Sequence, residues 1–479
     1  MVETKTSPLK TYFDELEEAD GDDEYRAWLV RVFNAKKDLV EFAGRSRQGG
    51  GAGSYVEFLN GSFNFSFRVN FNDGQNVIIR FPKPGHTTFR EEKVRNEVRV
   101  MEYLRQNTTI PIPRVHSWGL TNESPQQLGP FIIMDFIEGI HLSTILGQPD
   151  EPELVLDPNI DNALLDKVYR QIAGYMLQLS HLRFSQIGAI SKDNNSNTWR
   201  VTARPLTYNM NELATVTGSP EDQFPTEPFD RASNYFKSVA KEHLTHLWTQ
   251  RNIADSPEVA RGRFIARHRM LDLIPKYCVD DADAGPFIPF CDDFRPSNML
   301  VDPETFRITA VFDFEFTNAM PAQFAYDPPW WLLLSGPEVW FDRCAGEEFV
   351  SLYKPRMEQF LRALEQVEVE ENCKCNGAVL PAIGHQQQQH QPEEPSLSSS
   401  LAARMRESWE SGRFWFNYAM RKSFDLDVVY WTALRQHDDD DKVAALETEM
   451  RSEMEKFIKT KMEQFKVYEE ECRVRFHRK

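Results

Sequence analysis

The alternation of hydrophobic and polar residues predicts a small antiparallel sheet and one helix in the first third of the chain. Residues 65–71 alternate as a strand, Asp73-Gly74 is a hairpin turn, and residues 76–81 return as the next strand. Another buried strand is predicted at 131–137. Residues 89–106 repeat at helical spacing, and one apolar face consists of Val94, Val98, Met101 and Leu104.

The remaining pattern is mainly helical. Apolar residues recur at helical spacing once before the sheet and repeatedly after it, in 25–41, 163–182, 233–248, 259–277, 341–371, 401–423 and 443–475. A chain of 479 residues, 41% of them hydrophobic, can bury a large core. We therefore expect a small first lobe built on the sheet and a large, mainly helical second lobe.

Three segments are predicted to be irregular. The acidic tract Asp14–Glu24 is expected to be solvated, and the glycine-rich residues 45–54 are expected to form a flexible linker. Residues 372–400 have low complexity and are predicted to be a disordered insertion. We expect an N-terminal extension at 1–48, a first lobe at 49–139 and a second lobe at 140–479.

Charge and composition narrow the possible partners. The formal net charge of −18 argues against nucleic-acid binding and against binding to an anionic membrane, because both require basic patches. An acidic chain is compatible with a cationic substrate. The six cysteines lack the Cys-x-x-Cys spacing of metal sites. The sequence shows no apolar run of membrane-spanning length and no basic-then-apolar signal sequence, so we expect a soluble, cytoplasmic protein.

A second hairpin is predicted within residues 290–316. The apolar run 299–301 leads into a turn at Asp302-Pro303, and a strand at 308–312 follows. Residues at the open end of a hairpin lie close together. The sequence therefore predicts that the polar residues before the first strand meet those after the second.

Three of these polar residues fit the needs of phosphoryl transfer. Asp293 could accept a hydroxyl proton, while Asn298 and Asp313 offer an amide oxygen and a carboxylate to magnesium. Arg295, two residues after the proposed base, could lie against the transferring phosphate. Taken singly, each of these residues is better explained by a structural role, because such residues are common in turns and helix caps.

The motif Asp-x-Arg-Pro-x-Asn, with Asp-Phe-Glu fifteen residues after the asparagine, resembles the aminoglycoside phosphotransferase and choline kinase-like family, in particular its divergent fungal branch. The usual family motif is HGDLHPGN. Here Cys291 replaces the first histidine, Asp292 the glycine and Arg295 the second histidine. The resemblance implies an α+β, two-lobed protein-kinase-like fold, a small-molecule hydroxyl as substrate, and ATP and Mg²⁺ as cofactors. It assigns Asp293 as the base and Asn298 and Asp313 as magnesium ligands.

The resemblance also implies a nucleotide site in the first lobe. The turn at Gly61-Ser62 would cover the ATP phosphates, and Arg80 stands where the family has its phosphate-binding lysine, with Lys83 as a second choice. Glu97 resembles the acidic partner of that cation. Residues Asp135 to Ile137 resemble the hinge, whose backbone hydrogen-bonds the adenine.

Several alternatives stay open. The strands at 56–81 also fit a plain meander, and 131–137 fits an ordinary core strand. At the level of function, a catalytically inactive nucleotide-binding or scaffold protein on the same fold competes with the phosphotransferase. Two further alternatives are an interaction protein that uses its acidic tracts and C-terminal helix, and a hydrolase that uses Asp313 and Glu315. The family serves aminoglycosides, choline, homoserine and sugars, so the acceptor stays open.

Overall fold

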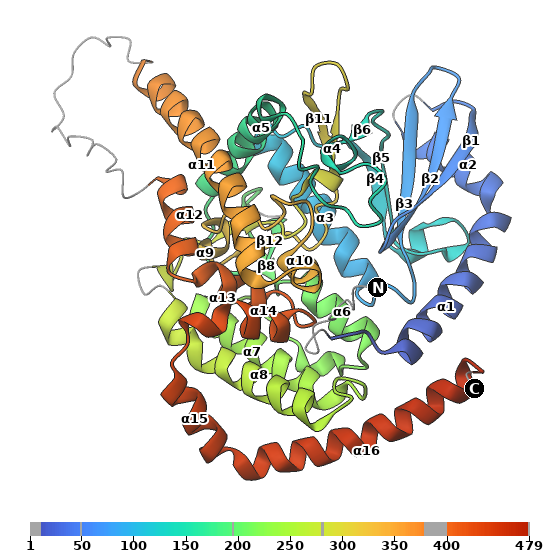
Figure 1. Cartoon of the computed structure of the whole chain (residues 1–479). Coiled ribbons are helices and arrows are strands. Elements are labelled where there is room, and N and C mark those ends of the chain that lie inside the picture. The colour runs from blue at the N-terminus through green and yellow to red at the C-terminus, as the bar shows by residue number, and fades with distance from the viewer. Residues whose placement is uncertain (1–10, 48–49, 194–195, 279–281, 378–399, 478–479) are drawn as a thin grey trace.

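The computed structural model describes residues 11–47, 50–193, 196–278, 282–377 and 400–477. A five-stranded antiparallel sheet in the order β1-β2-β3-β5-β4 forms the first lobe, at the upper right of Figure 1. Its strands are β1 (Gly53–Asn60), β2 (Asn64–Phe71), β3 (Asn76–Pro82), β4 (Val115–Gly119) and β5 (Phe131–Asp135). Helix α3 (Arg90–Asn107) lies between β3 and β4 in sequence. The predicted sheet and helix are confirmed, although β5 ends at Asp135 rather than at residue 137.

The acidic N-terminal tract is helical, which corrects the prediction of a solvated segment. Helix α1 (Glu15–Asn34) begins in this tract and is followed by α2 (Lys36–Ser46). Asp14 caps α1, because its side chain accepts hydrogen bonds from the backbone N–H groups of the first turn. Three acidic residues in that first turn also suit the positive end of the helix dipole.

The second lobe is mainly helical, as predicted (Figure 1). Its longer helices are α5 (Asn162–His181), α7 (Ala232–Thr249), α8 (Pro257–Tyr277), α11 (Gly346–Gly377) and α16 (Arg451–Arg475). The shorter helices are α4 (Leu142–Leu146), α6 (Tyr208–Val216), α9 (Ala322–Ala325), α10 (Pro337–Arg343), α12 (Leu401–Glu410), α13 (Arg413–Met420), α14 (Leu426–Thr432) and α15 (Asp440–Glu449).

Four helices expected to be continuous are broken. The one predicted at 25–41 ends at Asn34 and resumes at Lys36, and the one predicted at 341–371 is interrupted between Arg343 and Gly346. The helix predicted at 401–423 divides into α12 and α13 at Gly412, whose φ of +78° interrupts the helix and favours glycine. The terminal helix divides into α15 and α16 at Met450. Helix α11 continues to Gly377, so the predicted insertion does not begin at residue 372, and its residues 378–399 lie outside the described part of the chain.

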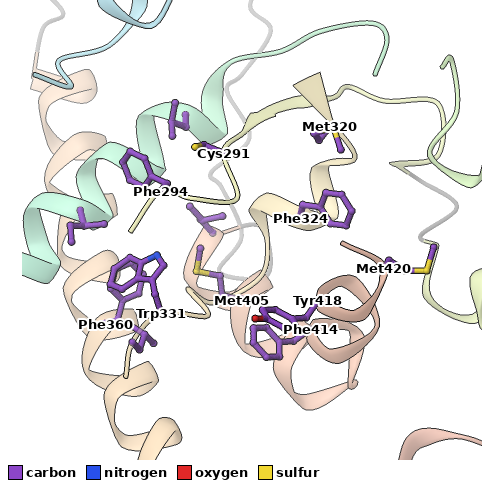
Figure 2. Packing of buried hydrophobic residues seen from close by; sticks show 14 of the residues in the cluster. Cys291, Phe294, Met320, Phe324, Trp331, Phe360, Met405, Phe414, Tyr418 and Met420 are labelled. Carbon is purple, nitrogen blue, oxygen red and sulfur yellow. The ribbon is translucent and has the colours of Figure 1, made fainter. Parts of the chain in front are cut away.

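The core of the second lobe surrounds the predicted catalytic segment. Figure 2 shows Cys291 and Phe294 of that segment in the same apolar cluster as Trp331 and Phe360. Phe414 is fully buried in this cluster. Packing of this density fixes the backbone on which the polar residues of the segment stand.

Short strands complete the second lobe. The predicted hairpin is present as β10 (Met299–Val301) and β11 (Ile308–Val311), and β6 (Ile140–His141) pairs with the other edge of β10. Two further pairs join β9 (Ile288–Phe290) to β12 (Asn318–Met320), and β7 (Ala189–Lys192) to β8 (Trp199–Ala203). In the part of the chain that the structure describes, no helix combines the length and apolarity needed to cross a bilayer.

Candidate active site

A cavity of about 1110 Å³ lies where the two lobes meet. Strands β1 to β3 and the end of β5 supply one side, and the segment that leads into and out of the β10–β11 hairpin supplies the other. Nine of the ten predicted site residues line this cavity: Gly61, Ser62, Arg80, Asp135, Ile137, Asp293, Arg295, Asn298 and Asp313. The tenth, Glu97, is buried behind Arg80.

Asp293 is held by two neighbours from its own loop. The side-chain amide of Asn298 donates to Asp293 Oδ2 at 2.7 Å and to its backbone oxygen at 3.0 Å. Arg295 Nε lies 2.6 Å from Asp293 Oδ1. Burial raises the pKa of Asp293, while Arg295 and the hydrogen bond from Asn298 oppose that rise. The carboxylate is therefore positioned and partly desolvated, as a proton acceptor in a closed site should be.

Asp313 follows β11 and enters the cavity from a strained backbone position. Its φ is +66°, in the left-handed region that residues other than glycine rarely occupy. Burial and the neighbouring Glu315 raise the pKa of Asp313 to about 7, against the opposing effect of Arg80. Its Oδ1 lies 3.0 Å from Arg80 Nη1 but accepts no well-oriented hydrogen bond from any described residue. This buried oxygen is therefore held by its ion pair with Arg80 and not by a hydrogen bond.

The donor set at this point fits magnesium. Among the described residues, no group of three or more His, Cys, Asp or Glu side chains is arranged to hold a metal ion. The amide oxygen of Asn298 and the carboxylate of Asp313 would instead supply two protein oxygens to the ion. Mg²⁺ commonly takes one or two protein oxygens and completes its octahedron with water and phosphate oxygens.

Arg80 pairs with three carboxylates, two of which belong to the second lobe. It forms a close ion pair with Glu97 on α3, and it reaches Asp313 at 3.0 Å and Glu315 at 3.4 Å. Burial alone would lower the pKa of Arg80, but the three carboxylates raise it above its usual value. Arg80 thus stays charged at the inner end of the cavity, where a phosphate-binding cation is expected.

The chain matches the phosphotransferase enzyme family over residues 56–364, more than half of its length. That range contains both sides of the cavity described above. The chain belongs to the phosphotransferase enzyme family. The resemblance inferred from the catalytic motif is therefore confirmed.

Two relatives of this phosphotransferase-family protein come from fungi. It is 24% identical over 294 residues to the clavilactone A biosynthesis cluster protein Y of Ampulloclitocybe clavipes, covering 56% of this chain and 62% of the relative. It is 23% identical over 284 residues to altered inheritance of mitochondria protein 9, mitochondrial, of Yarrowia lipolytica, covering 53% of this chain and 48% of the relative. The chain thus spans about half to three-fifths of the length of these relatives.

Solved structures show a more distant likeness. An ethanolamine kinase of Plasmodium vivax aligns with a TM-score of 0.41 and 10% identity, covering 91% of this chain and 86% of the other. The family assignment does not depend on this alignment.

A second buried cation, which the sequence did not single out, stands beside Arg80. Lys93 on α3 is 1% exposed, and its Nζ lies 2.5 Å from Glu315 Oε2 and 2.7 Å from Asn64 Oδ1. The amide of Asn64 in turn donates to Glu315 Oε2 at 2.6 Å. These three residues form a closed ring that joins β2, α3 and the segment after β11. Lys93 lies four residues before Glu97, on the same helix face, and this spacing was the available sequence signal.

The predicted hinge offers one backbone donor to the cavity. The N–H groups of Asp135 and Phe136 donate to Arg114 and Asn76, whereas the N–H of Ile137 has no hydrogen-bond partner among the described residues. The side chain of Asp135 is turned away toward His116, whose Nε2 lies 2.7 Å from Asp135 Oδ1. Ile137 therefore suits adenine recognition through its backbone better than Asp135 does.

The far end of the cavity is acidic and aromatic, and this too was missed in the sequence. Glu212, Asp292 and Glu338 line it together with Tyr208, Trp330 and Tyr418. Lys422 Nζ lies 3.5 Å from Asp292 and 4.5 Å from the centre of the Tyr208 ring. Burial raises the pKa of Glu212 to about 7, although Lys422 and Tyr208 oppose the rise. These residues come from α6, the loop after β9, the segment between α9 and α10, α10 itself, and α13 with the residues that follow it, so no single motif reveals them.

Cys291 and Asp292, two departures from the family motif, each contact another part of the second lobe. Burial raises the pKa of the Cys291 thiol, and its Sγ donates to the backbone oxygen of Asp313 at 3.8 Å. Asp292 forms a close ion pair with Arg421, which lowers the pKa of Asp292 against the effect of burial. Cys291 therefore supports the loop, while Asp292 lines the cavity and ties it to Arg421.

Proposed function

We propose that this protein transfers the γ-phosphoryl group of ATP to the hydroxyl group of a small, cationic molecule. The observation that carries the proposal is the convergence of Asp293, Asn298 and Asp313 on one cavity, opposite Arg80. One proton acceptor, two magnesium-binding oxygens and one phosphate-binding cation are the parts that this reaction needs.

In this scheme Asp293 orients the acceptor hydroxyl and takes up its proton late in the transfer. Arg80 and Arg295 offset the charge that develops on the phosphoryl oxygens. Magnesium, held by Asn298 and Asp313, would supply further charge neutralisation at the phosphates. Gly61, Ser62 and the N–H of Ile137 would contact the phosphates and the adenine from the first lobe.

The far end of the cavity supports a cationic acceptor. Four carboxylates line it, those of Glu212, Asp292, Glu338 and Asp425, and they face the side chains of Lys422 and, behind Asp292, Arg421. Acidic groups therefore exceed basic ones. Aromatic rings at the same end can add a cation–π contribution.

Replacement of the base tests this function. With Mg·ATP and a panel of amine-bearing alcohols, Asp293→Asn should lower the rate of ADP release by about 10²- to 10⁴-fold, the usual range for a general base. Binding of Mg·AMP-PNP should change little. The matched control is Glu304→Gln, an exposed acidic residue in the turn of the same hairpin. An Asp293→Asn rate equal to that of the wild type would contradict the proposal.

A nucleotide-binding protein without catalytic activity is the second candidate. Arg80 stands where the family has its phosphate-binding lysine, and it already pairs with three carboxylates. An arginine in this geometry would hold the phosphates differently from a lysine, which favours the second candidate. A wild-type protein that binds Mg·AMP-PNP but releases no ADP with any acceptor would favour this candidate.

A cytoplasmic location remains a prediction, which microscopy of the tagged protein would test.

A further inference from the structure

The acceptor end of the cavity is completed by residues outside the family match. The match covers residues 56–364, yet Thr11, Tyr12 and Phe13 line the cavity from the N-terminal side. Tyr418, Lys422 and Phe424 line it from the C-terminal side. The part of the cavity that would contact the acceptor is therefore shared between the family region and two flanking segments.

We propose that Tyr12 and Phe13 form a wall of the acceptor site and select the alcohol by the size and shape of its apolar part. This inference rests on the proposed function, because it places the acceptor alcohol at this end of the cavity. The acceptor would be an amine-bearing alcohol with an apolar flank. Its amine would face the carboxylates, and its apolar flank would lie against Phe13.

The backbone of this wall is fixed by the second lobe. The side chains of Gln250 and Asn252 donate to the backbone oxygens of Tyr12 and Phe13, at 2.7 and 2.8 Å. The N–H of Asp14 donates to the backbone oxygen of Val216 at 3.2 Å. Three consecutive residues are thus anchored to the loop after α7 and to the end of α6, as a rigid wall requires.

A buried ion cluster holds the residue before the wall. Thr11 Oγ1 donates to Asp427 Oδ2 at 3.4 Å and accepts a close hydrogen bond from Arg263. Asp427 is fully buried and also pairs with Arg267 at 3.0 Å. Ordering Thr11 against this cluster restricts the positions open to Tyr12, whose residue surface is otherwise 60% exposed.

Phe13 also connects the wall, through apolar contacts, to the segment that follows Asp313. Its ring meets that of Phe424 edge to face, with ring centres 4.6 Å apart. Phe13 and Phe424 belong to one apolar cluster with Phe316, which lies three residues after Asp313. The wall therefore adjoins the site of phosphoryl transfer, and a change of volume at residue 13 should alter which acceptors fit beside Asp293.

The test compares Phe13→Ala, Phe13→Leu and Tyr12→Ala with the wild type on a panel of ethanolamine, choline and kanamycin. Val30→Ala, an exposed position on α1, is the control. Phe13→Ala should raise the KM of the best acceptor by about tenfold or more, or admit bulkier acceptors, since one lost apolar contact discriminates about 10- to 200-fold. Phe13→Leu keeps most of the apolar volume and guards against misfolding. Its KM should lie between the KM of the wild type and that of Phe13→Ala. The Kd for Mg·AMP-PNP should stay within about twofold of the wild type.

The outcomes separate the wall from the proposed function. If the wild type phosphorylates a panel member, and the KM values and acceptor ranking of the Phe13 and Tyr12 variants equal those of the wild type, the wall is refuted while the function stands. If the wild type phosphorylates none, the protein is labelled with 4-fluorophenylalanine at residue 13 and titrated with the same amines. A ¹⁹F shift caused by an amine but not by Mg·AMP-PNP supports the wall, and the absence of any shift overturns it.

Discussion

The inner end of the site contains five largely buried, charged side chains that pair with one another. Arg80 and Lys93 bring two positive charges to a region that also holds three carboxylates, Glu97, Asp313 and Glu315. The excess of negative charge favours the entry of a divalent cation. Lys93 contributes by neutralising Glu315 from the side away from the cavity, so its replacement should leave a buried carboxylate poorly paired.

Removal of this ammonium should destabilise the protein. We expect Lys93→Met to lower the free energy of unfolding by about 3–5 kcal/mol, the usual cost of breaking a buried pair. The double variant Lys93→Met/Glu315→Gln should recover part of that loss, because the unpaired charge is gone. Urea denaturation of the two single variants and the double variant measures this coupling. A Lys93→Met protein as stable as the wild type would show that the ion pair contributes nothing.

Glu212 should give the proposed acceptor site a pH dependence. Because burial raises its pKa to about 7, Glu212 is largely neutral below that pH and ionised above it. A cationic acceptor should bind more tightly to the ionised form, so its KM should fall as pH rises from 6 to 8. Steady-state kinetics with Glu212→Gln should show a flat profile across the same range. Equal pH profiles for the variant and the wild type would remove Glu212 from acceptor binding.

Helix α1 is the element that links the two ends of the cavity. Its N-terminal flank contributes the wall of Tyr12 and Phe13, and its Tyr25 hydroxyl donates to Asn60, beside the turn at Gly61, at 2.8 Å. The indole N–H of Trp28 donates to the backbone oxygen of Leu128 at 2.6 Å and fixes the helix to the first lobe. A chain segment outside the family region therefore contacts both lobes.

Close packing of two glycines sets the position of α1. A Cβ atom added at Gly21 would lie 2.3 Å from the backbone oxygen of Gly85. Gly21→Ala should therefore lower the free energy of unfolding by about 1–3 kcal/mol through overpacking. At an open helix position the same change would instead stabilise by about 0.5–1 kcal/mol. Thermal unfolding shows whether Gly21→Ala destabilises or stabilises the protein, with Val30→Ala as the control. A Gly21→Ala protein more stable than the wild type would contradict the close contact.

The same helix shows where reasoning from sequence fails. The tract 14–24 is so acidic that a solvated segment was the natural prediction, yet Asp14 caps a helix there and is itself buried. Its order depends on partners far away in sequence, such as the Tyr468 hydroxyl, which accepts the N–H of Glu15 at 2.8 Å. Local composition carries no signal of contacts of this kind.

For the whole molecule, short-range alternation and turn chemistry predicted the strands, the helices and the hairpin that leads to Asp313. The two-lobed architecture was expected from the length of the chain and from the family resemblance. The acceptor end could not be predicted, because Glu212, Glu338 and Lys422 come from separate segments that only packing brings together. The proposed roles of the site residues and the division at 1–48, 49–139 and 140–479 remain predictions.

Calorimetric titration with AMP-PNP, with and without Mg²⁺, tests most directly whether this cavity holds a metal-bound nucleotide. In the wild type, Mg²⁺ should tighten AMP-PNP binding by about tenfold or more, which corresponds to ~1.4 kcal/mol or more. Asp313→Asn should remove most of that gain, while Glu304→Gln should retain it. A wild-type affinity that Mg²⁺ does not change, or an Asp313→Asn protein with the full magnesium effect, would contradict the account.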